Sequence, residues 1–448
     1  MAGVEAATGN DRPQGSLSDS WRVINGRNDW AGLLDPMDPL LRTELIRYGE
    51  MAQACYDAFD NESYSKYCGS CKYDRSNFFK CLGMGESGYE VTRYLYATIN
   101  LQLPNFFTKP LGADDWNANA NWMGYVAVST DETSKRIGRR DITVAWRGTA
   151  TQLEWLANLT DFLVPASSEG IPCPNPDVKV ESGFINLYCD KVQGGSLCTY
   201  SARERILTEV ATLVDRYKDE EISITFTGHS LGGALALLSA FDVAEMGLNV
   251  TTDGRPIPIC VFSFSAPRVG NSRFKERIEG LGVKVLRVVN VHDLVPKVPG
   301  VLVNKSVPEI LKKLGQWLPY WSYSHVGVEL PLDHKNSPFL KSTLDLSCFH
   351  NLEAHLHLLD GYHGKGQSFF LSNGRDPALV NKASDFLKDE SHVPPRWRQE
   401  ENKGLVMKHD GRWIQLERPM FDEHLPEIYH HRLEQIMFRS SAMANIGE

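Results

Sequence analysis

The chain has no long apolar run. Among its 448 residues, no stretch of about 18 uncharged apolar residues occurs, so we expect no transmembrane helix. The most apolar stretch, Gly232 to Leu248, is interrupted by Asp242 and Glu245. Residues 1–20 lack the apolar core that a secretory signal needs, and they are too short and too acidic for a plastid transit peptide. The sequence therefore predicts neither a membrane anchor nor a targeting segment.

Basic residues are outnumbered by acidic ones. The 47 Lys and Arg residues against 56 Asp and Glu residues give a net charge of −9. A general nucleic-acid binder carries a net basic footprint, so we expect no nucleic-acid partner. Apolar residues make up 42% of the chain and charged residues 23%, which is ordinary for a soluble globular protein and argues against long disorder.

Cysteine is sparse and odd in number. Nine residues in a chain of this length do not suggest a secreted disulfide framework. Cys55, Cys68, Cys71 and Cys81 form a cluster with one C-x-x-C pair. A structural zinc site usually needs two such pairs, and no histidine lies nearby in the sequence. Zinc, a local disulfide and reduced thiols all remain open for this cluster, and we favour reduced thiols.

Strand and helix patterns alternate through the middle of the chain. We expect strands at 123–129, 141–148, 222–228, 258–267 and 283–290, and helices at 202–217 and 234–247. Such alternation predicts an α/β protein with a mainly parallel central sheet covered on both faces. Around this core, at 121–363, we expect a flexible tail at 1–20, a helical and irregular N-terminal region at 21–120, and a C-terminal appendage and tail at 364–448. Within the N-terminal region, Asp38 and Pro39 are predicted to begin a helix.

The strongest local signal is a G-x-S-x-G motif, Gly228-His229-Ser230-Leu231-Gly232. A β-rich run precedes it and an Ala/Leu-rich helical run follows. In a nucleophile elbow, the glycines allow a strained turn and let the helix pass close to the strand. The turn places the serine hydroxyl at the carboxyl edge of the sheet and directs the next backbone N–H into an oxyanion hole. We therefore predict Ser230 as a catalytic nucleophile and Leu231 as an oxyanion donor.

A serine nucleophile needs an acid and a base, which follow it in that order in this fold class. Asp293 comes at the end of the predicted strand VKVLRVVN, where Pro296 prevents further pairing. Asp242 is a weaker candidate because it lies within the helix after the serine. Of the later histidines, His350 lies at a loop-to-helix junction, whereas His325 precedes a strand-like run. We predict Asp293 as the acid and His350 as the base, with His325 as the alternative base.

The second oxyanion donor is expected in the loop after an earlier strand. The run WRGT at 146–149 follows the strand pattern DITVAW, and Thr149 offers a backbone N–H and a hydroxyl. Beyond it, an amphipathic stretch is compatible with two interpretations. One is an ordinary core-packing helix, and the other is a lid that covers the site in water and turns to lipid. The candidate lid, 150–164, carries the apolar residues Leu153, Trp155 and Leu156.

Long segments of the chain resemble plant class 3 lipases of the phospholipase A1-I gamma type. The similarity covers about residues 20–420 and includes NDWAGLLDPMDPLLR, GRRDITVAWRGT, TGHSLGGALA, VVNVHDLVP and HNLEAHLHLLDGYHG. The segments CGSCKY and LPNFF look most like the I gamma subgroup. The resemblance implies an α/β-hydrolase fold, hydrolysis of the sn-1 acyl ester of phospholipids and galactolipids, and a chloroplast location. Residue by residue, it implies Ser230 as nucleophile, Asp293 as acid, the His350 of HNLE as base and Thr149 in the oxyanion hole. The stretch 301–321 lengthens the loop between acid and base.

These observations predict a serine acylhydrolase, a carboxylic ester hydrolase of the phospholipase A1, galactolipase and lipase type. It releases fatty acid through an acyl-enzyme and needs no metal or organic cofactor. We expect a transient encounter with glycerolipid at a membrane surface, no protein partner, and a chloroplast location by resemblance or otherwise a cytoplasmic one. Two alternatives remain open, a non-catalytic lipase-like signalling protein and an esterase for soluble acyl esters.

Overall fold

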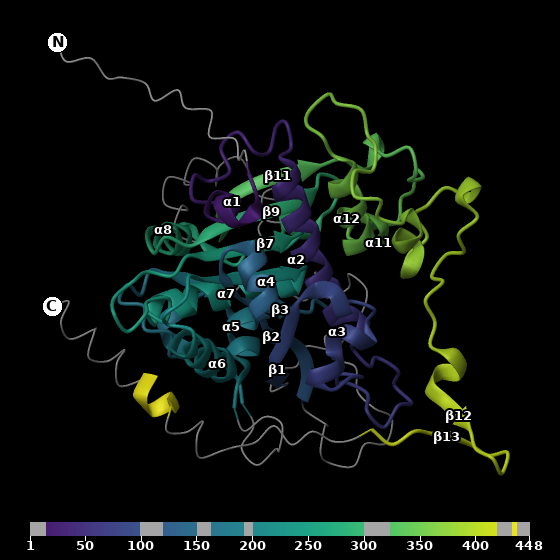
Figure 1. The fold of residues 1–448 in the computed structure, drawn as a ribbon, viewed down its shortest axis with the longest axis horizontal. Helices are drawn as coiled ribbons and strands as arrows, with labels where there is room; N and C mark the ends of the chain where they lie inside the picture. Colours follow the sequence, from purple (N-terminus) through teal and green to yellow (C-terminus); the bar gives the residue numbers. More distant parts are fainter. Residues whose placement is uncertain are drawn as a thin grey trace, which may run out of the picture.

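A seven-stranded sheet forms the centre of the protein (Figure 1). The computed structural model describes residues 15–98, 120–149, 163–191, 200–299, 323–418 and 432–436. From β3 onward the neighbouring strands are parallel, whereas β1 and β2 pair antiparallel at one edge. In spatial order the strands are β1 (Tyr89–Thr98), β2 (Ala120–Ser129), β3 (Arg140–Trp146), β6 (Ile222–His229), β7 (Ile259–Phe264), β9 (Lys284–Asn290) and β11 (Val328–Leu332).

Helices cover both faces of this sheet, as expected for parallel strands that are apolar on both sides. Every residue of β6 is buried, for example. On one face α7 packs on β6 and β7 and is joined by α5 and α6, and on the other face α2 packs on the sheet and against α12. The helices are α1 (Leu17–Ile24), α2 (Pro39–Asp57), α3 (Phe78–Cys81), α4 (Asp131–Ile137), α5 (Ser182–Cys189), α6 (Ala202–Arg216), α7 (Leu231–Glu245), α8 (Ser272–Gly280), α11 (Leu346–Phe349) and α12 (Leu352–Gly361). The predicted parallel sheet with two covered faces is confirmed.

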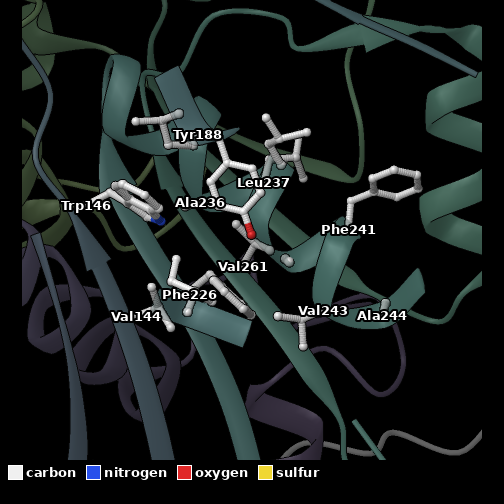
Figure 2. Close-up of a cluster of buried hydrophobic side chains, with 14 of the residues drawn as sticks. Val144, Trp146, Tyr188, Phe226, Ala236, Leu237, Phe241, Val243, Ala244 and Val261 are labelled. Carbon is white, nitrogen blue, oxygen red and sulfur yellow. The ribbon is translucent and has the colours of Figure 1, made fainter. Parts of the chain in front are cut away.

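Two hydrophobic cores result, one on each face of the sheet. Figure 2 shows part of the first, in which Trp146 of β3, Tyr188 of α5 and Leu237 of α7 gather around the sheet. The second core lies between the sheet and the pair α2 and α12. As predicted, Asp38 caps α2, accepting hydrogen bonds from the N–H groups of Leu40 and Leu41 at 2.9 and 3.0 Å, with Pro39 as its first residue.

A buried carboxylate joins α2 to the sheet at the start of β3. Asp141 is fully buried, and hydroxyl groups from α2 and three strands donate to it at 2.7–2.9 Å, namely those of Tyr48, Tyr89, Thr143, Ser223 and Thr225. Burial alone would raise the pKa of Asp141, but the nearby guanidinium groups of Arg139 and Arg47 and the hydroxyl donors outweigh it and lower the pKa. The network thus holds an ionised carboxylate at the amino ends of the parallel strands.

The N-terminal region departs from the expectation of a helical and irregular segment at 21–120. It contributes a strand of 10 residues, β1, to the edge of the main sheet. The pairing of β1 with β2 shifts register between Val91 and Arg93 and again between Leu95 and Tyr96. Such bulges break the two-residue alternation of apolar side chains, which explains why the pattern gave no strand signal. In the same region Cys55 and Cys81 carry free thiols.

Smaller sheets lie outside the central one. Four short antiparallel strands form the second sheet. A peripheral hairpin of β12 and β13 follows later in the chain (Figure 1). These strands are β4 (Leu163–Pro165), β5 (Lys179–Glu181), β8 (Gly270–Asn271), β10 (Tyr323–Ser324), β12 (Leu405–Met407) and β13 (Trp413–Gln415). None of the helices in the described ranges has the length and apolarity needed to span a bilayer.

Candidate active site

Ser230 lies in a tight turn between β6 and α7. Its backbone has φ 59° and ψ −130°, a strained conformation for a residue with a side chain. The turn leaves no space for side chains at the flanking glycines. A Cβ atom on Gly228 would lie 2.3 Å from the carbonyl carbon of Gly232, and one on Gly232 would lie 2.5 Å from the carbonyl oxygen of Trp146. The geometry is that of a nucleophile elbow at the carboxyl end of a parallel strand.

Asp293 and His350 approach each other from two different loops. Asp293 follows β9, and His350 lies between α11 and α12. His350 Nδ1 lies 2.6 Å from Asp293 Oδ2, and the Val295 N–H donates to Asp293 Oδ1 at 2.9 Å. Burial alone would raise the pKa of Asp293, but His350 and the two hydrogen bonds outweigh it and lower the pKa. An ionised carboxylate on Nδ1 leaves Nε2 of the neutral imidazole as the proton acceptor.

Three buried polar atoms at this place have no hydrogen-bond partner among the described residues. They are Ser230 Oγ, His350 Nε2 and His229 Nε2. The ring of His229, the residue before the serine, lies 4.5 Å from the ring of His350, so the three atoms belong to one cluster. Leaving a buried polar atom unpaired costs about 1–3 kcal/mol. A catalytic role is one explanation for such an atom in a native structure. The structure thus brings together Ser230, Asp293 and His350.

The predicted oxyanion residues flank the elbow. Thr149 is half-buried in the loop after β3, and Leu231 is the first residue of α7, where backbone N–H groups have no acceptor within the helix. A Cβ atom on Gly148 would lie 2.6 Å from the His229 carbonyl oxygen and 3.2 Å from the Ser230 Cβ. The loop that carries Thr149 therefore runs directly against the turn that carries the serine.

A buried arginine holds this loop in place. Arg147 donates from Nη1 to the Gly148 carbonyl at 2.8 Å and from Nε to the Trp122 carbonyl at 3.2 Å. Its guanidinium carbon lies 3.7 Å from the centre of the Phe59 ring. Burial lowers the pKa of Arg147 to about 10, so the side chain remains charged at neutral pH. The path of the loop after β3 is thus set by fixed hydrogen bonds.

Tyr56 of α2 is a contact of the site that the sequence did not reveal. Its hydroxyl lies 2.8 Å from Nδ1 of His229 and also touches the backbone at Gly148. Burial raises the pKa of Tyr56, while burial and the neighbouring His350 and His355 hold the pKa of His229 well below its usual value. Both groups are therefore neutral, and they share one hydrogen bond between the tyrosine hydroxyl and the imidazole. The partners are 173 residues apart, so no local pattern indicates the pair.

The competing candidates have other partners. Asp242 is buried in an ion pair with Arg203, at 2.8 and 3.0 Å, and accepts from the Tyr188 hydroxyl at 3.0 Å. His325 donates from Nε2 to the Pro296 carbonyl at 2.7 Å, and burial lowers its pKa to about 3. A histidine whose nitrogen is engaged in this way is a poor candidate for the base. The geometry favours Asp293 and His350.

Two predicted segments cannot be compared with the structure. Residues 150–162 of the candidate lid, including Leu153, Trp155 and Leu156, lie outside the described residues, as does the stretch 301–321. The end of the candidate lid is described and forms β4. The choice between a lid and a core-packing helix therefore stays a prediction.

Comparisons with known proteins place the chain among lipases. Residues 143–303 match the family Lipase (class 3). Phospholipase A1-Igamma1, chloroplastic, of Arabidopsis thaliana is 64% identical over 419 residues, which cover 92% of this chain and 81% of that protein. Galactolipase DONGLE, chloroplastic, of the same plant is 46% identical over 350 residues, 77% and 70% of the two chains. A solved structure of nonglycosylated Yarrowia lipolytica LIP2 lipase matches with a TM-score of 0.43 and 19% identity, over 67% of this chain and 82% of that one. The family match and the mainly parallel sheet confirm the predicted α/β-hydrolase fold.

Proposed function

Because the chain belongs to the plant class 3 lipases of the phospholipase A1-I gamma type, we propose that it hydrolyses the sn-1 acyl ester of glycerolipids at a membrane surface. The observation that carries this proposal is the Asp293–His350 pair, with its 2.6 Å contact, beside a serine in a nucleophile elbow. The relatives are named phospholipase A1 and galactolipase, which supports phospholipids and galactolipids as the substrate classes. Relatives named chloroplastic likewise support a chloroplast location.

The proposed mechanism follows from the three side chains. His350 Nε2 takes the proton of Ser230 Oγ as the oxygen attacks the ester carbonyl, and Asp293 stabilises the resulting imidazolium. The backbone N–H groups of Leu231 and Thr149 stabilise the oxyanion of the tetrahedral intermediate. The intermediate collapses as the carbon–oxygen bond to the lyso-lipid breaks, and His350 gives its proton to the departing alkoxide. A water molecule, deprotonated by His350, then cleaves the acyl-serine ester and frees the fatty acid.

Contact with the membrane is proposed to involve an apolar rim on the loops that carry the acid and the base. The rim consists of Val291 and Leu294, which flank Asp293, and Leu344 and Leu346, which precede His350. The side chains are 39%, 42%, 96% and 43% exposed, respectively. Because Asp293 and His350 touch, the two loops lie next to each other. Fully burying one aliphatic side chain in a bilayer contributes about 1.5–3 kcal/mol, so these residues favour docking with the site turned to lipid.

The test is hydrolysis of phosphatidylcholine and galactolipid vesicles whose sn-1 and sn-2 chains differ in mass. Mass spectrometry of the products identifies the released fatty acid and the lyso-lipid. We expect the wild-type protein to release the sn-1 chain and Ser230→Ala to lose about 10⁴–10⁶ in kcat. Ser239→Ala is a matched control, because within the described ranges this buried serine of α7 bonds only to the helix backbone and to Trp146 Nε1. Its activity should stay within about tenfold of wild type.

Each part of the proposal has its own contrary result. A Ser230→Ala protein that is folded by circular dichroism and retains activity within tenfold of wild type would exclude the serine mechanism. Release of the sn-2 chain alone would overturn the regiochemistry while leaving the mechanism intact.

A further inference from the structure

A second cluster of polar side chains lies next to the triad acid. His292 precedes Asp293 in the loop after β9, and Asp333 and His334 follow β11. Each of the three side chains offers one ligand atom, and these atoms lie within 4.8 Å of one another. His292 Nε2 is 3.1 Å from Asp333 Oδ1, and the rings of the two histidines are centred 4.7 Å apart. The proposed hydrolysis assigns no role to these residues.

The sheet itself brings the cluster together. β9 and β11 are parallel neighbours, with Asn290 paired to Leu332 at their carboxyl ends. The residues that directly follow the two strands therefore leave the same edge of the sheet side by side. His292 is 41 positions from Asp333 and 42 from His334, yet the sheet holds the three side chains together. Support by a rigid element favours a preformed site.

Surrounding residues fix the orientation of the buried histidine. His334 is 5% exposed, and its ring stacks on Phe349 at 4.6 Å with an interplanar angle of 20°. Its Nδ1 lies 3.4 Å from Oδ1 of the buried Asn290. The other two side chains are about one-third exposed, at 31% for His292 and 35% for Asp333. One anchored imidazole and two ligands reachable from solvent are what an ion needs to enter and be held.

The donor set selects the kind of ion. Two imidazole nitrogens and one carboxylate oxygen suit Zn²⁺, which is commonly bound by such three-residue sets with one position left for water. Ca²⁺ and Mg²⁺ prefer oxygen ligands throughout and are disfavoured here. Tetrahedral bonds of about 2.0–2.1 Å place neighbouring ligand atoms roughly 3.3 Å apart, close to the separation of His292 Nε2 and Asp333 Oδ1.

We propose that His292, Asp333 and His334 form a binding site for one Zn²⁺ ion, beside the catalytic centre and separate from its chemistry. The ion bridges the loop after β9 to the loop after β11. Because Asp293 is the residue after His292, the bridge restrains the backbone that presents the triad acid to His350. The ion thus helps to position Asp293, and it takes no part as a reactant in the hydrolysis.

Zinc binding is tested on the full-length protein after treatment with EDTA and removal of the chelator. Isothermal titration with ZnCl₂ measures affinity and stoichiometry, and a thermal melt measures stabilisation. We expect one Zn²⁺ per chain and a higher Tm with Zn²⁺, but no comparable effect with MgCl₂ or CaCl₂. The variants His292→Gln and Asp333→Asn should each weaken the affinity at least about tenfold. His409→Gln, a change of an exposed histidine outside the cluster, is the matched control and should bind as wild type.

The outcomes separate the proposal from its alternatives. If wild type binds no stoichiometric Zn²⁺, the cluster is only a histidine–carboxylate pair. If the two variants bind Zn²⁺ as tightly as wild type, the ion is held elsewhere, for example by thiols, and the proposal is wrong. None of these measurements requires substrate, so a failure here leaves the proposed hydrolase activity untouched, and the reverse also holds.

Discussion

Exchanging one histidine at a time decides which imidazole serves as the base. His350→Gln removes the ring whose Nδ1 lies 2.6 Å from Asp293 Oδ2, and it leaves an amide N–H in place of the lost donor. Alanine is a poorer choice, because an unpartnered buried carboxylate costs about 3–5 kcal/mol and would confuse loss of fold with loss of chemistry. The companion variant, His325→Gln, breaks the 2.7 Å hydrogen bond from Nε2 to the Pro296 carbonyl.

The structure gives the two variants very different expected effects. Members of a catalytic triad act as a unit, so His350→Gln should reduce kcat by about 10⁴–10⁶. At about 1.36 kcal/mol per factor of ten, this loss corresponds to roughly 5–8 kcal/mol of transition-state stabilisation. His325→Gln loses one neutral hydrogen bond, which contributes about 0.5–1.5 kcal/mol to stability, and its kcat should stay within about tenfold of wild type.

The assay is the initial rate of fatty-acid release from phosphatidylcholine vesicles, with urea unfolding and circular dichroism recorded for each protein. An inactive His325→Gln together with an active His350→Gln would move the base to His325. If both variants keep wild-type rates and are folded, no histidine of this pair serves the serine, and the triad as proposed does not exist.

Three further predictions concern the buried network and the apolar rim. Asp141→Ala should lower the free energy of unfolding in urea by about 3–5 kcal/mol, because it leaves buried hydroxyls and arginines without their acceptor; a loss below about 1 kcal/mol would show that the network contributes little. Folding lowers the pKa of Asp141, so its ionised carboxylate adds to the free energy of unfolding at any pH above the unfolded pKa of about 4. This stabilisation is lost as the pH falls through the lower folded pKa. Asp141→Asn should therefore make the free energy of unfolding less dependent on pH in the acid range. Leu294→Asp and Leu346→Asp should reduce activity on bilayers far more than on a short soluble ester, and equal losses on both substrates would contradict a membrane role for the rim.

The sequence was most informative where one local pattern determines one local structure. The buried strand at 222–229 is rich in β-branched residues, and the glycines around Ser230 are the only residues that fit the close passage of α7 over β6. The cap at Asp38 is equally local, since its acceptor and donors are two and three residues apart. In each case the interacting atoms are near in sequence.

Contacts between distant segments were beyond such reasoning. The two register shifts of β1 remove the alternating pattern by which a strand is recognised in a sequence. The place of β1 at the sheet edge depends on its pairing with β2. Tyr56 reaches His229 only because α2 packs against the far side of the sheet. The separation of His350 from His325 likewise required the fold. Both follow Asp293, and only the packing of α12 shows which ring meets the carboxylate.

The position of His350 also determines when in its synthesis the chain gains its proposed catalytic centre. The serine and the acid fall within the matched range 143–303, whereas the base lies 57 residues beyond the acid and is followed by α12, which packs on α2 from near the other end of the protein. A nascent chain that has emerged only as far as Asp293 contains the elbow and the acid, but no base. Acyl transfer must await emergence of residues 350–361 and their docking onto the first long helix. The order of the chain thus makes the proposed catalytic centre complete only late in synthesis.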